Sequence, residues 1–134
     1  MGLIMSYALP DDLINIENEV AWKDRDNPKT LYGMIFRTVQ KFPNHDAVSY
    51  QIFSGPKDKA ETFSWKELFD KTTQAANMFR ALGVNETDVV AYVLPNSNET
   101  LLSLLGGAVS GIVAPINPLL EVEQIAAILR ETNA

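Results

Sequence analysis

The sequence predicts an α/β protein made of a β-hairpin and a parallel βαβα unit with flanking helices. Two short strand-like runs, 47–53 and 61–63, are separated by a turn rich in Gly, Pro and charged residues, which is typical of a hairpin. Two further apolar runs, 89–94 and 112–116, each precede a segment with helical spacing of apolar residues. This strand–helix–strand–helix order favours parallel strands joined by a right-handed crossover.

The composition is that of an ordinary globular protein. The 134 residues carry a net charge of −6, are 46% hydrophobic, and include one His and no Cys. We therefore expect one domain or part of one, without disulfides or a multi-histidine metal site. The acidic balance argues against nucleic-acid and anionic-membrane partners. No apolar stretch is long enough to span a bilayer, and no secretory signal is recognised, so we expect a cytoplasmic protein.

Residues 1–29 show little periodicity and are predicted to form an N-terminal arm lying over a body. The run 22–28 is charged and turn-rich, and we expect Asp24, Arg25 and Asp26 to be solvated. Gly2 and Ser6 fit a loose myristoylation pattern, although so short a pattern often recurs by accident.

The first predicted helix follows Thr30, a plausible N-cap, and stops at Pro43. Its expected buried face is Leu31, Ile35, Val39 and Phe42. The hairpin follows, with Val48, Tyr50 and Ile52 alternating along its first strand.

The strongest helix signal begins at Ser64. With Glu67 this residue forms a capping box, in which each side chain satisfies an unpaired backbone N–H. Gly83 supplies a left-handed C-cap. The expected apolar stripe is Trp65, Leu68, Phe69, Thr72, Ala76, Phe79 and Leu82.

The βαβα unit starts with the continuous apolar run 89–94, which predicts a strand covered on both faces. Pro95, Asn96 and Ser97 break the run and cap a helix, with Glu99 three residues after Asn96. Gly111 ends that helix, whose predicted stripe is Leu101, Leu104, Leu105 and Ala108. After the strand 112–116, a last helix is predicted with Ile125, Ile128 and Leu129 facing inward.

A βαβα sequence that stops after a helix lacks the strand that would be expected to follow that helix. The expected sheet has unpaired edges and an uncovered face. We therefore expect the front part of a longer polypeptide, with an apolar surface available for the remainder of the chain or for self-association.

Candidate site residues are few, and each has a plainer structural explanation. Glycines 106, 107 and 111 resemble a phosphate loop, but no Lys follows and they lie at the C-terminal end of a helix, so close helix packing is favoured. Ser110 lacks the G-x-S-x-G context of a nucleophile. His45 beside Asp46 falls in a predicted turn without a partner nucleophile.

Glu121 and Glu123 could hold a cation, but two carboxylates that open a helix more often complement its dipole. Trp22, Trp65 and Tyr92 are expected to pack in the core or under the arm. The sequence therefore predicts no catalytic, cofactor-binding or metal-binding residue in these 134 positions.

Two core motifs and a strand resemble those of the adenylate-forming (AMP-binding) superfamily, which includes acyl-CoA synthetases, peptide-synthetase adenylation domains and luciferases. Residues 62–68 with 76–77 and 82–84 resemble the first core motif, residues 88–96 the strand that follows it, and residues 107–118 the second core motif. The sequence of residues 116–121 is most similar to that of acyl-CoA synthetases acting on fatty or related acids. The resemblance runs from about residue 30 to 134 and implies the N-terminal portion of an adenylation domain, ending before the nucleotide motifs.

The resemblance implies a two-step reaction. ATP and a carboxylic acid give an acyl-adenylate and diphosphate, and the thiol of coenzyme A then displaces AMP. ATP, Mg²⁺ and coenzyme A are implied for a full-length enzyme, whose phosphate loop, adenine motif, ribose Asp and C-terminal Lys are absent from this sequence. Some relatives have a basic residue after the Asn-Pro pair that contacts coenzyme A. This sequence has Leu119 at that position, so we infer no contact with coenzyme A for it.

The leading hypothesis is thus an N-terminal acyl-CoA synthetase fragment that is inactive alone. One alternative is a complete small acidic α/β protein-interaction domain. Another is one half of a split or oligomeric ligase. The acid's chain length cannot be read from these residues.

Overall fold

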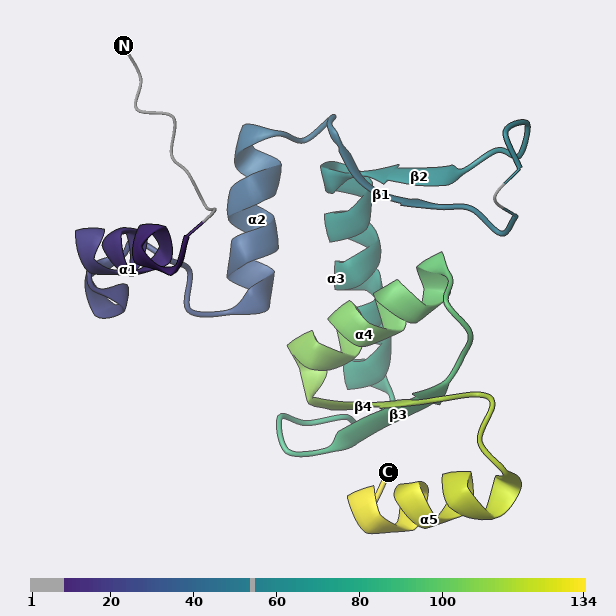
Figure 1. Ribbon diagram of the computed structural model, residues 1–134. Coiled ribbons are helices and arrows are strands. Elements are labelled where there is room, and N and C mark those ends of the chain that lie inside the picture. The colour runs from purple at the N-terminus through teal and green to yellow at the C-terminus, as the bar shows by residue number, and fades with distance from the viewer. Residues whose placement is uncertain (1–8, 54) are drawn as a thin grey trace.

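The computed structural model describes residues 9–53 and 55–134 (Figure 1). Helices α2, α3 and α4 form the centre, with one two-stranded sheet at one end and a second at the other. The bounds in chain order are α1 (Pro10–Glu19), a 3₁₀ turn (Trp22–Asp24), α2 (Leu31–Lys41), β1 (Asp46–Tyr50), β2 (Glu61–Ser64), α3 (Trp65–Ala81), β3 (Val89–Val93), α4 (Asn98–Ser110), β4 (Ile112–Ile116) and α5 (Val122–Thr132).

The N-terminal arm contains a helix that the sequence analysis missed. Pro10 occupies the first turn of α1, and the Asp12 carboxylate accepts the backbone N–H of Leu9 at 3.1 Å. At the other end, the Arg25 guanidinium donates to the carbonyls of Ile16 and Val20 at 3.0 and 3.1 Å. Because Arg25 satisfies two carbonyls at the helix end, the expectation that its charge is merely solvated is wrong.

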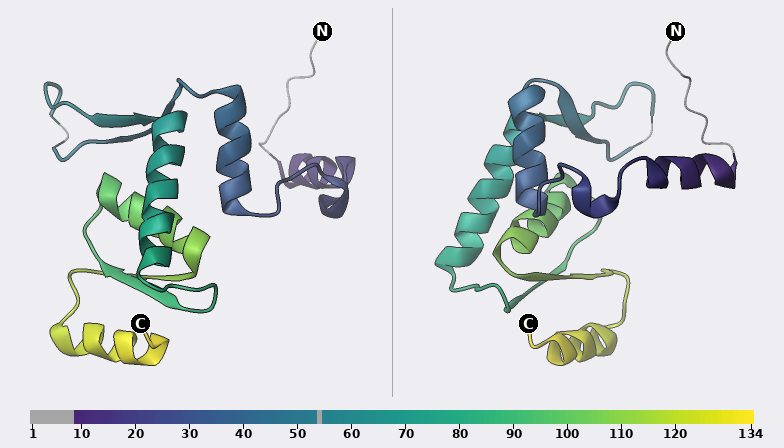
Figure 2. Two further views of the ribbon diagram at one scale, coloured as in Figure 1. Left: turned by 180° about the vertical axis from the view of Figure 1, so that it is seen from behind. Right: turned by 90° about the vertical axis from the view of Figure 1, so that its left-hand side faces the viewer.

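The arm also does not cover the body. Helix α1 lies beside α2 and projects away from the other elements in both views (Figures 1 and 2), and none of its residues is buried. Trp22 is 79% exposed, so the expectation that its ring packs under the arm is wrong. The myristoylation pattern at Gly2 and Ser6 lies outside the described residues.

Helix α2 begins where predicted, since Thr30 Oγ1 accepts the Gly33 N–H at 3.0 Å. Its inward face is narrower than predicted: Ile35 and Val39 are buried, whereas Leu31 and Phe42 at the helix ends are about half exposed. Within the part of the chain that the structure describes, no other element buries these two end positions.

The hairpin is confirmed as an antiparallel pair, β1 with β2. Pairing ends at Tyr50 opposite Glu61, so β1 stops three residues earlier than predicted. Beyond it Ile52 and Phe53 are 73% and 72% exposed. The alternating pattern of residues 48, 50 and 52 therefore predicted a strand longer than the one observed.

Helix α3 carries the capping box predicted for Ser64 and Glu67. The Ser64 N–H donates to Glu67 Oε2 at 2.8 Å, and the Glu67 N–H donates to Ser64 Oγ at 3.2 Å. Gly83 ends the helix with φ +96°, as expected. Leu82 is 76% exposed, so the predicted stripe is one residue too long.

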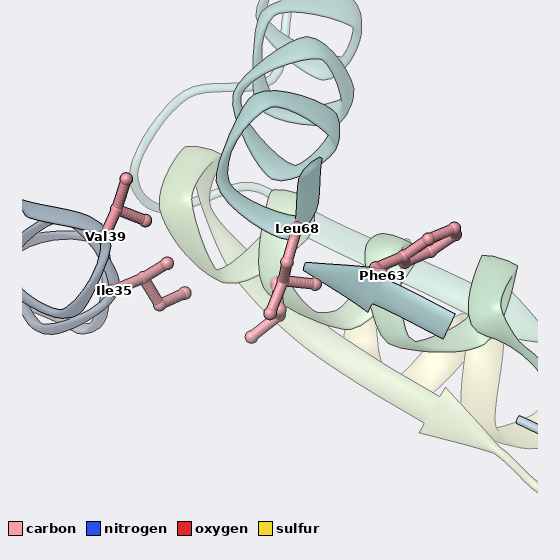
Figure 3. Close-up of a cluster of buried hydrophobic side chains, with 5 residues drawn as sticks. Ile35, Val39, Phe63 and Leu68 are labelled. Atoms are coloured by element: carbon pink, nitrogen blue, oxygen red, sulfur yellow. The ribbon is translucent and has the colours of Figure 1, made fainter. Parts of the chain in front are cut away.

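The core lies where α2, α3 and α4 meet the hairpin (Figure 3). In Figure 3, Leu68 of α3 lies between Ile35 and Val39 of α2 on one side and Phe63 of β2 on the other. The buried cluster consists of Ile35, Val39, Phe63, Leu68 and Leu105. Trp65 packs against this cluster, as predicted.

Helix α4 is sandwiched between α3 and the second sheet. A Cβ on Gly106 would lie 2.5 Å from Ala75 Cβ of α3, and one on Gly107 would lie 2.5 Å from Val113 Cγ1 of β4. Glycine at both positions therefore allows the two contacts at once. Ala108, predicted to face inward, is exposed instead because these glycines occupy the contact faces.

Strands β3 and β4 are parallel, with a register running from Val89 opposite Ile112 to Val93 opposite Ile116. The prediction that β3 is covered on both faces is wrong: Val90 is buried, but Val93 is 39% exposed. Helix α4 packs on one face, while α5 lies on the other side of the sheet without a fully buried residue (Figure 1).

The total accessible surface is 10,249 Å², whereas a compact domain of 14.9 kDa exposes about 7,000 Å². Over the described residues each sheet has only two strands, so each strand has an unpaired outer edge. Within this described portion, no helix combines the length and apolarity needed to cross a membrane.

Candidate functional site

The carboxyl ends of β3 and β4 are the edge at which an α/β sheet of this kind places a ligand site. Val93 pairs with Ile116, so the loops 94–97 and 117–121 start side by side. Both loops lead directly into helices, which places the N-termini of α4 and α5 after this edge. It is therefore the natural place to look for function.

The N-terminus of α4 is capped by Ser97, whose Oγ accepts the Thr100 N–H at 3.2 Å. The sequence predicted a cap within Pro95, Asn96 and Ser97, with Glu99 noted three residues after Asn96, and the structure assigns the cap to Ser97. The Ser97 backbone is extended, with φ −164° and ψ 173°, while Asn98 already lies in the helix.

A small cleft of about 240 Å³ lies between this helix start and the hairpin. It is lined by residues 48–50 of β1 and by residues from 96 to 104. Asn98, only 2% exposed, donates from Nδ2 to Glu61 Oε2 at 2.6 Å. This contact ties α4 to the hairpin. Among the described residues, Asn98 Oδ1 has no hydrogen-bond partner.

Two carboxylates have pKa values held below their ordinary value. The pKa of Glu67 is lowered chiefly by the Ser64 backbone N–H and then by the Ser64 hydroxyl. The pKa of Glu99 is lowered by its own backbone N–H and then by the Ser97 hydroxyl. Both groups stabilise helix starts, and neither pKa is raised toward neutrality as a general acid requires.

The glycine-rich segment packs against neighbouring elements, as predicted, and does not form an open loop. Ser110, 1% exposed, donates from Oγ to the carbonyls of Ala76 and Gly106, both at 3.0 Å. A Cβ on Gly111 would lie 2.5 Å from the Asp88 carbonyl oxygen. The glycines therefore face packed neighbours, and the single Ser110 hydroxyl proton is shared between two backbone carbonyls.

The other candidates are also structural. His45 lies in an exposed turn with its ring edge-on to Phe42, the centroids 5.3 Å apart, and its carbonyl accepts the Trp65 N–H at 3.0 Å. Glu121 and Glu123 are exposed at the start of α5. Across residues 9–53 and 55–134, no cluster of three His, Asp or Glu side chains could hold a metal ion.

The sequence analysis missed the contact between Asn98 and Glu61. Asn98 gave no signal, because a polar residue in the first turn of a helix is ordinarily exposed. Its partner lies 37 residues earlier in the chain, and only the packing of α4 against the hairpin brings the two together.

Comparison with known proteins gives a consistent result. The family model described as AMP-binding enzyme matches residues 35–134. Marinolic acid–CoA ligase of Pseudoalteromonas sp. is 33% identical over 105 residues, which is 78% of this chain and 16% of the ligase. 4-Coumarate–CoA ligase 1 of Arabidopsis thaliana is 32% identical over 108 residues, 80% of this chain and 18% of the ligase.

Peptide synthetases match as well: gramicidin S synthase 2 of Aneurinibacillus migulanus is 25% identical over 77% of this chain and 2% of the synthase. Among solved structures, the fatty acyl CoA synthetase of Mycobacterium tuberculosis superposes with a TM-score of 0.67 and 22% identity, over 79% of this chain and 20% of that one. The chain thus spans about a fifth or less of the length of these proteins. The superposition confirms the α/β arrangement of hairpin, parallel pair and helices.

Proposed function

Since the chain belongs to the AMP-binding enzyme family, we propose that it is the N-terminal scaffold of an acyl-CoA synthetase. The whole enzyme would join ATP and a carboxylic acid into an acyl-adenylate, releasing diphosphate. The thiol of coenzyme A would then attack the acyl carbon and displace AMP. The observation that carries this proposal is the match to two CoA ligases, 33% and 32% identical over about four fifths of the chain.

The described residues do not fit a nucleoside triphosphate. The family implies ATP with Mg²⁺, and four phosphate charges beside a carboxylate require cations nearby. Between Arg80 and Arg130 the sequence has no Lys or Arg, and the starts of α4 and α5 carry Glu99, Glu121 and Glu123. We therefore assign these residues no step of the reaction.

What the chain supplies is a support. Helix α4 packs against α3 through Gly106 and against β3 and β4 through Gly107, and the free edges of these strands offer backbone groups for further strands. We propose that residues outside this sequence complete the sheet, bind ATP, Mg²⁺ and coenzyme A, and form the acid pocket. A fatty acid is the proposed substrate class, and the cytoplasm the proposed location.

A peptide-synthetase adenylation domain is the second candidate, favoured by the match to gramicidin S synthase 2. Both candidates form an acyl-adenylate. They differ in the acceptor thiol, which is free coenzyme A in the first and a thiol carried on a protein in the second. A small protein-interaction domain without enzymatic activity remains the third.

The test is ATP–pyrophosphate exchange with a panel of fatty, aromatic and amino acids. Two samples are compared: the 134-residue chain, and the complete product of its reading frame purified from its own cells. We expect exchange only from the complete product, followed by thioester formation on added coenzyme A. Exchange by the 134-residue chain alone would disprove the scaffold role. If the complete product shows no exchange with any acid, the result would support the protein-interaction domain. If it shows exchange but forms no thioester with coenzyme A, the result would support the peptide-synthetase adenylation domain.

A further inference from the structure

Helix α1 carries an apolar stripe that the fold leaves open. Leu9, Leu13, Ile16 and Val20 recur at intervals of four, three and four residues, which places them on one face of a helix. Leu9, Leu13 and Val20 are 63%, 52% and 42% exposed, and no residue of α1 is buried. Among residues 9–53 and 55–134, Figures 1 and 2 show no other helix or strand over α1.

Trp22 follows this stripe in the chain and lines one hollow together with Ile16. The Arg25 guanidinium bonds to the carbonyls of Ile16 and Val20, which holds the turn 22–24 against the end of α1. The indole remains 79% exposed beside a hollow of about 480 Å³ lined by Ile16, Glu17, Trp22 and Arg25. An exposed Trp next to an open hollow has the properties of an interface anchor, because a large apolar ring is available for burial.

The charge around the stripe selects the partner. Residues 9–26 contain six acidic side chains and two basic ones. Glu17 and Glu19 lie on either side of the stripe by helical spacing, so a second copy of α1 packed on it would bring carboxylates together. A helix with Lys or Arg beside its own apolar face would instead be attracted.

We propose that α1 and Trp22 form a docking element for a basic amphipathic helix of another protein. The element lies before residue 35, where the match to the family model begins, so it is distinct from the part of the chain shared across the family. It therefore adds an interaction to the scaffold role and does not depend on it.

The test uses two synthetic helical peptides with the same Leu face, one flanked by Lys and the other by Glu. Each is fluorescently labelled and titrated with the 134-residue chain, and anisotropy gives the dissociation constant. We expect the Lys peptide to bind, to shift the Trp22 emission to shorter wavelength, and to bind more weakly as salt is raised. The Glu peptide should not bind. Binding of both peptides alike, or of neither, would overturn the proposal.

Variants separate docking from general attraction to an acidic protein. Leu13→Asp should raise the dissociation constant of the Lys peptide by about tenfold or more. Leu119→Asp, at an 88% exposed apolar residue in the loop before α5, is the matched control and should stay within about twofold. The double change Glu17→Lys with Glu19→Lys leaves the apolar stripe intact. Lys near the C-terminus of α1 interacts favourably with the helix dipole, so the helix should persist. The binding preference should then move from the Lys peptide to the Glu peptide. Equal effects of Leu13→Asp and Leu119→Asp, or an unchanged preference after the double change, would refute the docking element.

Discussion

Replacing Gly106 by Ala tests whether close contact between α3 and α4 sets the stability of the scaffold. The new Cβ would lie 2.5 Å from Ala75 Cβ and 3.1 Å from both Ala75 C and Ala76 N. Since two of these three atoms belong to the α3 backbone, rotating a side chain cannot relieve the overlap. The helices must instead separate by about 1 Å to restore ordinary contact.

Two opposing terms decide the outcome. Ala is favoured over Gly in a helix by about 1 kcal/mol, whereas overpacking a tight contact costs about 1–3 kcal/mol and also loosens the neighbouring core contacts. Because two of the three overlaps are with backbone atoms, we expect a cost in the upper part of that range, about 2–3 kcal/mol, so that Gly106→Ala lowers the free energy of unfolding by a net of about 1–2 kcal/mol. Urea titration followed by the far-ultraviolet circular dichroism measures this difference.

A double-mutant cycle identifies the cause. Ala75→Gly removes the opposing methyl group, so Gly106→Ala should cost less in its presence, with a coupling energy of about 1 kcal/mol. Ala108→Gly, on the exposed face of the same helix, measures only the difference in helix propensity between Ala and Gly. A Gly106→Ala protein as stable as the parent, with additive effects in the cycle, would refute the packing argument.

The remaining predictions concern polar groups. Thr72 is fully buried and its Oγ1 has no partner among the described residues, so Thr72→Val should raise the free energy of unfolding by about 1 kcal/mol in urea titration. The folded-state pKa of Glu67 is lowered through its bonds to Ser64, so its ionised form stabilises the fold above the ordinary value of 4.5, and this stability is lost as the pH falls through the lowered pKa. The difference in Tm between the parent and Glu67→Gln should therefore shrink as the pH is lowered past that window; a constant difference would contradict the capping role. Asn98→Asp should cost about 2 kcal/mol or more at neutral pH, because a buried carboxylate then faces Glu61, and thermal unfolding should show partial recovery in mild acid once one of the two is protonated.

The elements that local sequence determines were predictable. Ser64 and Glu67 lie three residues apart, Thr30 lies three residues before Gly33, and Gly83 ends its helix through its own backbone freedom. In each case the residues that form the contact are neighbours in the chain. Local pattern therefore located both helix starts and the end of α3.

The features that depend on distant contacts were not predictable. Helix α1 is completed at its C-terminus by Arg25, which lies beyond the helix. The exposure of Val93 depends on what covers the second face of the sheet, which an apolar run alone does not reveal. The contact between Asn98 and Glu61 requires the packed hairpin.

No catalytic or binding residue was predicted in the sequence, and this remains a prediction. The described residues hold helix caps, close-packed glycines and one buried amide, all of which maintain the fold. The sequence identified the family because its motifs include these structural positions.

The proline in β4 has a consequence for how the free sheet edge behaves. The Ile112 N–H donates toward β3, to the Asp88 carbonyl at 2.9 Å, and N–H directions alternate along a strand, so Val113 and Pro115 face the outer edge. Because Pro has no N–H, a strand arriving from outside meets only the Val113 donor between Ile112 and Ile116. Accidental growth of the sheet into cross-β aggregates is disfavoured at this edge, even while the neighbouring apolar surface stays open.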